Sequence, residues 1–251
     1  MTAPELLAAL DLPVSTRVQQ RVPKKLLLEN GAPTAADKRV INDGIEEIQW
    51  LAVLKPANIG VLPYRDAARE YLEIAVLQVT FREDAKVSRP IELIHRAIPY
   101  PALLLSTQGT ETGISLAHKR WSQNEVGKVV LDDEPLVVSM VDAPEGIHRD
   151  FLEALPLAAQ PRSSLFALYQ SWLDDLIALQ AALQTGSFRL LGSDTARDAR
   201  RAALLESSEL REQLVSLRAA AKKTSQMARQ VELNLQIKEL ERKLAHVRDD
   251  L

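Results

Sequence analysis

Residues 210–251 read LREQLVSLRAAAKKTSQMARQVELNLQIKELERKLAHVRDDL, and apolar residues recur in them alternately four and three positions apart. A seven-residue repeat of this kind places one apolar seam along a helix, which is stable only when another helix covers it. Because neither glycine nor proline follows Gly192, we expect residues 193–251 to form one long coiled-coil helix. The first register of the repeat contains Leu210, Leu214, Leu217 and Ala221 and continues through Thr224, Ala228, Val231 and Leu235. The second register contains Leu233, Ile237, Leu240, Leu244, Val247 and Leu251.

The change between the two registers predicts a local stutter or a change of partner face. The seam also narrows over residues 219–228, which include Lys222, Lys223 and Thr224. Two alternatives exist for what covers it: the helix expected at residues 163–184, or a second molecule, either another copy or a different protein. About 55 helical residues would reach roughly 80 Å, more than a domain of this size, which favours the second molecule. The predicted partner-helix seam consists of Leu210, Leu214, Leu217, Val231, Leu235, Ile237, Leu240, Leu244 and Val247.

The earlier part of the chain has the pattern of strands with helices between them. Residues 48–54 and 71–81 are rich in β-branched and aromatic residues, which favour strands. The other strand candidates are residues 102–107, 113–121 and 127–141, and helices are expected at residues 23–31, 34–44 and 91–98. This order predicts an α+β fold with a small mixed or antiparallel sheet and flanking helices. A helical segment and the long C-terminal coiled-coil helix follow it.

Three parts of the chain are expected from these patterns. The first is an α+β domain at residues 1–145. The second is a helical segment at residues 146–192, which carries an apolar stripe wide enough to dock on the first domain. The third is the coiled-coil helix at residues 193–251.

The composition limits the classes of function. The chain has 251 residues, a net charge of -3 and no cysteine, which excludes disulfides, thiolate nucleophiles and thiolate metal sites. The negative net charge means that contact with a polyanion must come from a local patch. Residues 1–13 lack the basic flank of a secretory signal, and no apolar run approaches the roughly 18 residues that a membrane span needs. We therefore expect a cytoplasmic protein that does not enter a membrane.

A basic cluster near the N-terminus is the main candidate for phosphate binding. It consists of Arg17, Arg21, Lys24 and Lys25, with no acidic residue between Ser15 and Leu28. Arginine forks match phosphate geometry, so the cluster predicts contact with a nucleic-acid backbone. The alternative is a solvated face, or a dock for the chain's own acidic segments.

Glu73, Asp84 and Lys86 have the residue types of a degenerate metal-dependent nuclease, in which two carboxylates hold a divalent ion and a lysine positions the attacking water. The alternative is a surface loop, because acid-x-lysine triplets are common in a charged chain. His118 to Trp121 could likewise present a basic and aromatic face to nucleic acid, or form an exposed edge strand protected by charge.

Cofactor and metal sites are not expected. The four histidines have no metal-ligand spacing, and the sequence has neither a glycine-rich phosphate loop nor a G-x-S-x-G elbow.

Short stretches in one order along the chain carry a family pattern. They are residues 15–18 (STRV) with 21–25 (RVPKK), 45–50 (IEEIQW) with Leu54, 73–77 (EIAVL), 94–101 (IHRAIPYP), Ser164-Leu165 with 167–169 (ALY), and 230–234 (QVELN) with Ile237, Lys238 and Leu240. In these stretches the chain resembles the uncharacterised bacterial domain-of-unknown-function family 4391. None of them is a catalytic signature. Residues 77–82 (LQVTFR) depart from the acidic and lysine-rich pattern of the family, which weakens a catalytic interpretation of that strand.

The resemblance implies a role by context, because members of the family occur beside DNA methyltransferases and helicases in bacterial restriction or phage-defence loci. The implied function is a non-enzymatic assembly subunit of a DNA-modification or antiviral-defence complex. It would bind a methyltransferase, a helicase or a second copy of itself through the C-terminal helix, with at most weak or indirect DNA contact. The alternative is a nucleic-acid-binding module or a degenerate metal-dependent nuclease.

Overall fold

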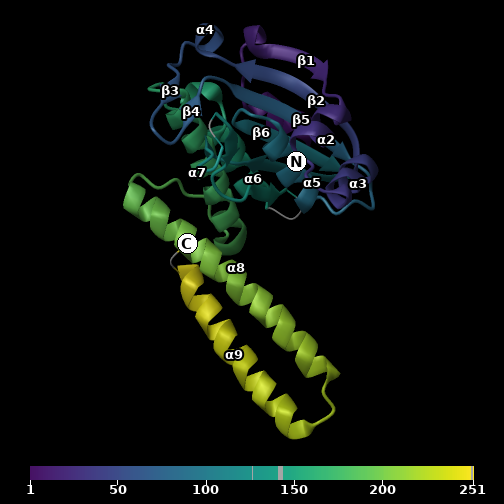
Figure 1. Cartoon of the computed structure of the whole chain (residues 1–251). Coiled ribbons are helices and arrows are strands. Elements are labelled where there is room, and N and C mark those ends of the chain that lie inside the picture. Colours follow the sequence, from purple (N-terminus) through teal and green to yellow (C-terminus); the bar gives the residue numbers. More distant parts are fainter. Residues whose placement is uncertain (126, 141–143, 250) are drawn as a thin grey trace. The chain divides into compact units, whose positions relative to one another are not determined.

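The chain has an α+β fold that divides into two compact units, Met1–Leu176 and Ile177–Leu251 (Figure 1). The computed structural model describes residues 1–125, 127–140, 144–249 and 251. The α+β class, the mixed sheet and the helical C-terminal region expected from the sequence are confirmed. The expected division at residues 145 and 192 stays a prediction. In the described part of the chain, no helix combines the length and the apolar character needed to cross a membrane.

A six-stranded sheet forms the centre of the first unit, with the strand order β1-β2-β5-β6-β7-β10. Neighbouring strands are antiparallel except β5 and β6, which are parallel and are connected through helix α5 (Ser88–Ala97). The strands are β1 (Arg17–Arg21), β2 (Ile45–Leu54), β5 (Ile74–Phe81), β6 (Ala102–Gln108), β7 (Glu111–Leu116) and β10 (Leu136–Ser139).

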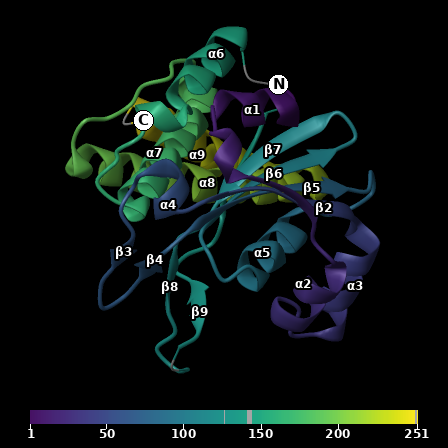
Figure 2. The ribbon, with the colours of Figure 1, turned by 90° about the horizontal axis from the view of Figure 1, so that it is seen from above.

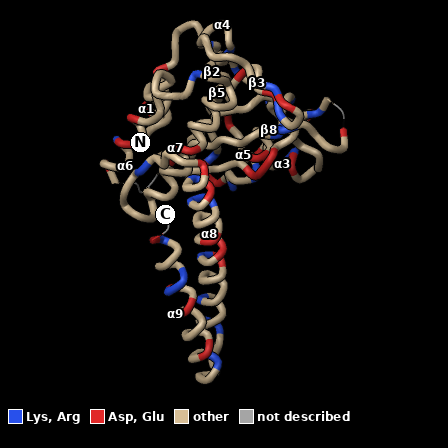
Figure 3. Tube along the Cα trace, turned by 90° about the vertical axis from the view of Figure 1, so that its left-hand side faces the viewer, with Lys and Arg blue, Asp and Glu red and all other residues tan. Residues whose placement is uncertain are grey.

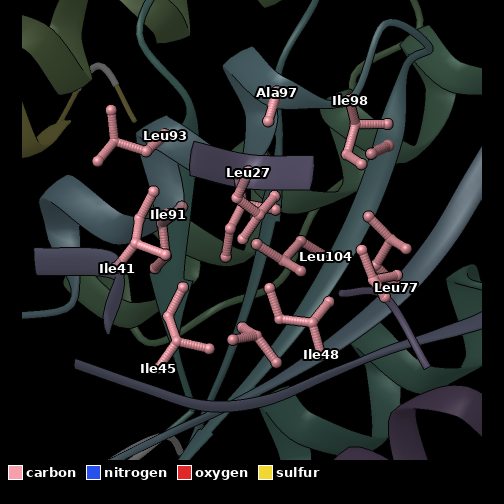
Figure 4. Packing of buried hydrophobic residues seen from close by; sticks show 14 of the residues in the cluster. Leu27, Ile41, Ile45, Ile48, Leu77, Ile91, Leu93, Ala97, Ile98 and Leu104 are labelled. Atoms are coloured by element: carbon pink, nitrogen blue, oxygen red, sulfur yellow. The ribbon is translucent and has the colours of Figure 1, made fainter. Parts of the chain in front are cut away.

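Helices cover both faces of this sheet. On one face lie α2 (Lys24–Asn30), α3 (Ala35–Gly44) and α5, and on the other lie α1 (Ala3–Ala9), α6 (Glu145–Ala154) and the first part of α7 (Leu165–Thr185) (Figure 2). This double cover explains why β5 is an almost unbroken apolar run, because a strand buried on both faces needs no polar alternation. Leu27, Ile41 and Ile91 from the helices meet Ile48, Leu77 and Leu104 from the strands (Figure 4).

Two small hairpins lie outside the sheet, and the second of them divides two of the expected strands. One pairs β3 (Tyr64–Arg65) with β4 (Glu70–Tyr71), and the other pairs β8 (Lys119–Trp121) with β9 (Val129–Leu131). The strand expected at residues 113–121 is divided into β7 and β8. The strand expected at residues 127–141 is divided into β9 and β10, because the acidic turn before Pro135 sends the chain to a different sheet. Its last residue, Val141, lies outside the described residues. The short helix α4 (Pro56–Ile59) and the 3-10 turns at Val14–Thr16 and Leu157–Ala159 complete this unit.

The second unit contains two long helices where we expected one. Helix α8 (Asp194–Lys223) ends at Thr224, and helix α9 (Met227–Asp249) runs back beside it as an antiparallel hairpin (Figure 1). The break between the helices falls where the seam consists of alanine, lysine and threonine. Few large apolar side chains are present there to stabilise one continuous helix. Turning back instead lets one half of the seam bury the other half.

Candidate functional site

Most of the predicted partner-helix seam lies at the interface between α8 and α9. Ala203, Leu210 and Val247 form its buried centre, with Leu240, Leu244 and Leu251 packed against it. Leu214 and Leu233 are also buried, and Leu217 and Ile237 are half-buried. The seam is therefore covered from within the C-terminal region. At one end of it, Gln184 of α7 accepts hydrogen bonds from Ser207 over 2.7 Å and from Arg211 over 3.0 Å.

Two residues expected in the seam lie on the opposite side of α9. Val231 is 55% exposed and Leu235 is 64% exposed, and Met227, four residues before Val231, is 79% exposed. Leu233 and Leu235 are two positions apart, about 200° around a helix, so they cannot both face α8. The second register, which includes Leu233, faces α8. The last two residues of the first register, Val231 and Leu235, therefore face away from α8. We call Met227, Val231 and Leu235 the outer strip.

Polar contacts fasten the hairpin along its length. Arg200, which is buried near the start of α8, donates to the backbone oxygen of Leu251 over 3.0 Å and to that of Arg189 over 2.6 Å. Arg218 Nη2 lies 2.7 Å from Glu241 Oε1 across the two helices. The hairpin thus has its own core and its own closing contacts.

The predicted phosphate-binding cluster is close together in the fold but mostly paired. Arg17 and Arg21 lie at the two ends of the exposed edge strand β1. Arg21 lies 3.8 Å from Glu47, and Lys25 lies 3.7 Å from Glu29. The Lys24 ammonium donates to the backbone oxygens of Asn42, over 3.2 Å, and Ile45. Lys24 therefore holds α2 against the end of α3 and the start of β2.

The predicted nuclease residues are not brought together. Glu73 precedes β5 and forms an ion pair with Lys55 at 2.9 Å, whereas Asp84 and Lys86 are exposed beyond the other end of that strand. The eight residues of β5 span about 26 Å, and two ligands of one ion must lie within a few ångströms of it. The two carboxylates cannot share a metal ion. Among the described residues, no group of three or more histidine, aspartate and glutamate side chains is placed to hold one.

The segment His118 to Trp121 also differs from both interpretations of its sequence, because Lys119 is only 2% exposed. Its ammonium donates to the backbone oxygens of Ile98, over 2.9 Å, and His95, at the C-terminal end of α5, where the helix dipole favours a cation. Burial lowers the pKa of Lys119 to about 7. Burial, together with the charge of Lys119, lowers the pKa of His95 to about 3. His95 Nε2 is 3.0 Å from Ser115 Oγ.

A second polar and aromatic cluster, which the sequence did not reveal, joins three elements of the first unit. The Tyr71 hydroxyl of β4 is 2.5 Å from His118 Nδ1, and His118 Nε2 is 2.9 Å from Gln170 Oε1 of α7. Tyr169 donates to Ala102 O over 2.8 Å, and Phe166 packs edge-on against Tyr71. These hydrogen bonds hold α7 against β6 and the β3–β4 hairpin. We interpret the cluster as a structural brace.

Comparison with known proteins gives a family without an assigned activity. Neither the curated proteins nor the solved structures contain a match to this chain. The family model described as "Domain of unknown function (DUF4391)" matches residues 10–244, which is most of the chain and includes the sheet and both helices of the hairpin. This chain belongs to the DUF4391 family.

Proposed function

We propose that this chain is a non-enzymatic assembly subunit that docks a protein partner on the outer strip of its C-terminal hairpin. The observation that carries the proposal is the exposure of Met227, Val231 and Leu235, by 55–79%, on a helix whose opposite face is already covered. The hairpin does not need a partner for its own seam, so this second apolar face is available to another molecule.

The spacing of the outer strip fits a known mode of recognition. Side chains at i, i+4 and i+8 lie above one another on one helix face, which is how a helix anchors itself in an apolar groove. Burying a large apolar side chain contributes about 1.5–3 kcal/mol, so three such anchors are enough for a specific contact.

The partner is proposed from the family resemblance. A DNA methyltransferase or a helicase of a bacterial restriction or phage-defence complex would be the protein that the hairpin binds, in the cytoplasm. The nuclease alternative has less support, because Glu73 and Asp84 lie at opposite ends of β5. Nucleic-acid binding through Arg17, Arg21, Lys24 and Lys25 also has less support, because Arg21, Lys24 and Lys25 have partners in the chain.

The test is co-expression of the full chain with the products of the flanking genes, followed by purification and mass measurement of the complex. We expect V231D/L235D to lose the partner while remaining folded by circular dichroism. The matched control is L205D, because Leu205 is 64% exposed on α8 and is not part of the outer strip. Retention of the partner by V231D/L235D, or absence of any complex with the wild-type chain, would contradict the proposal.

A further inference from the structure

The acidic side chains of α8 lie on one side of the helix. Arg211, Arg218 and Lys222 are spaced by seven and four residues and lie on one face of the helix. The carboxylates of α8 lie elsewhere, each at least about 80° around the helix from this row at 100° per residue. They are Asp194, Asp198, Glu206, Glu209 and Glu212. No acidic residue of α8 therefore lies on the face that carries Arg211, Arg218 and Lys222.

A groove of about 480 Å³ lies between the two helices beside the first two residues of this row. Arg211 and Arg218 line it from α8, and Glu241 and Arg248 line it from α9. Among the described residues that line the groove, Glu241 is the only acid and Val215 the only large apolar side chain that is mostly exposed. Glu241 forms an ion pair with Arg218 at 2.7 Å, so it partly compensates that charge. Arg211 donates instead to Gln184 and, over 3.4 Å, to Ser207, which are neutral partners and do not compensate its charge.

The excess of positive charge extends to the turn of the hairpin. Between Glu212 and Glu232 the chain has Arg218, Lys222, Lys223 and Arg229 and no acidic residue, and blue segments mark this end of the hairpin in Figure 3. The second unit holds thirteen lysines and arginines against ten aspartates and glutamates, although the whole chain has a net charge of -3. The second unit therefore has a net charge of +3 (13 − 10) within a chain that is negative overall.

We propose that the face formed by Arg211, Arg218, Lys222 and Arg248, which we call the arginine face, binds the phosphate backbone of double-stranded nucleic acid. The row on α8 is about 16 Å long, which covers about five steps of 3.4 Å along one strand of a duplex. Guanidinium groups donate two parallel hydrogen bonds to a phosphate, and such contacts carry no sequence information. Binding is therefore independent of sequence and sensitive to salt.

The composition of the arginine face favours nucleic acid over a lipid surface. Peripheral helices bind membranes by burying large apolar side chains among their cations. Here Leu214 is buried in the seam, and the outer strip lies on the side of α9 that faces away from α8. The face is rich in donors and poor in exposed apolar area, as expected for a backbone-binding surface.

The experiment measures fluorescence anisotropy of a labelled 30-base-pair duplex with the full chain at several salt concentrations. We expect a dissociation constant on the order of 10⁻⁴–10⁻⁶ M near physiological salt. R211Q/R218Q should weaken binding about tenfold or more and lower the slope of log K against log salt by about 2. E241Q should bind more tightly than the wild type, because it removes the acid from the groove.

The matched control is R65Q/R242Q, which removes the same charge from exposed positions paired with Glu70 and Glu239. We expect it to bind like the wild type. Absence of duplex binding by the wild type, equal loss in both double variants, or unchanged binding by R211Q/R218Q would overturn the proposal. Binding to vesicles of phosphatidylcholine with phosphatidylserine is measured in parallel. If R211Q/R218Q lost affinity for these vesicles but not for the duplex, the proposal would also be overturned. If R211Q/R218Q failed to fold, a duplex affinity of E241Q no higher than that of the wild type would overturn it. The outer-strip variant V231D/L235D tests the assembly proposal separately, because it leaves the arginine face intact.

Discussion

Arg200 Nε donates a hydrogen bond to the backbone oxygen of Leu251 over 3.0 Å, and this contact ties the start of α8 to the chain beyond the end of α9. The guanidinium is buried, and it also binds Arg189 O. The two backbone oxygens offset the cost of burying this charge, and through them Arg200 joins three parts of the chain. Removing the Arg200 side chain should therefore loosen the end of the hairpin at which α8 begins.

We expect R200M to lower the free energy of unfolding of the hairpin by about 1.5–3 kcal/mol, since hydrogen bonds from charged groups contribute in that range. Thermal unfolding followed by circular dichroism measures the change. R242M, at an exposed position of α9, is the control and should shift the midpoint little. Equal midpoints for the two variants would show that Arg200 does not fasten the hairpin.

The covered seam predicts a difference between two leucines of the hairpin. L210A should cost about 2 kcal/mol or more, because it leaves a cavity beside Val247, whereas L235A should change stability by less than about 0.5 kcal/mol. Denaturant unfolding at several protein concentrations measures both. The transition should not depend on concentration, because the seam is closed within one chain. A midpoint that rises with concentration would instead mean that a second copy covers the seam.

The carboxyl group of Asp175 should keep its proton in weakly acidic solution, because burial raises its pKa to about 7. It contacts the side chain of Gln160, whose amide nitrogen is occupied by Ala154 O and Pro156 O. Asp175 Oδ2 and Gln160 Oε1 are buried and have no hydrogen-bond partner among the residues that the structure describes, and a protonated Asp175 could donate to Gln160. Burial raises the pKa of Asp175 to about 7, so the stability that it contributes is present below about pH 4 and is lost as pH rises towards 7.

D175N retains a donor for Gln160 and has no charge. We therefore expect D175N to be more stable than the wild type by one to a few kcal/mol at pH 8, and the difference should shrink as pH falls to 4. Urea unfolding at pH 4, 6 and 8 measures it. A difference that stays constant with pH would show that Asp175 is ionised in the folded chain.

His95 should make the first unit sensitive to acid. Its folded pKa, about 3, lies below its unfolded value near 6.5, so the unfolded chain takes up the proton first. The stability is complete above about pH 6.5 and is lost as pH falls towards 3, at up to about 1.4 kcal/mol per pH unit. H95Q, which keeps a donor for Ser115, should flatten this part of the profile relative to the wild type. Parallel profiles for H95Q and the wild type between pH 6.5 and 4 would contradict the assignment.

Periodicity predicted the elements whose burial follows from their sequence. The unbroken apolar run of β5 and the two heptad registers of the C-terminal region are examples. The turn at residues 224–226 was harder to predict from the sequence, because it contains neither glycine nor proline. Its signal was the change of register itself, which a hairpin and a stutter both produce.

The candidate site depended on relations that spacing along the chain does not contain. Glu73 and Asp84 are eleven positions apart, a separation that a turn could close and that β5 holds open. Lys119 has the sequence context of an exposed residue, and only the carbonyl groups at the end of α5 make its burial favourable. The charge sorting of α8 was present in the sequence from the start, but it becomes a surface only when α9 supplies the other wall of the groove.

The turn at residues 224–226 also makes the hairpin a spacer of adjustable length. Adding seven residues to each helix at matched positions would keep every seam residue facing its counterpart and would carry the turn outward by about 10 Å. Removing seven from each would draw it back by the same step. The length of the hairpin can therefore change by whole heptads without any change in the sheet.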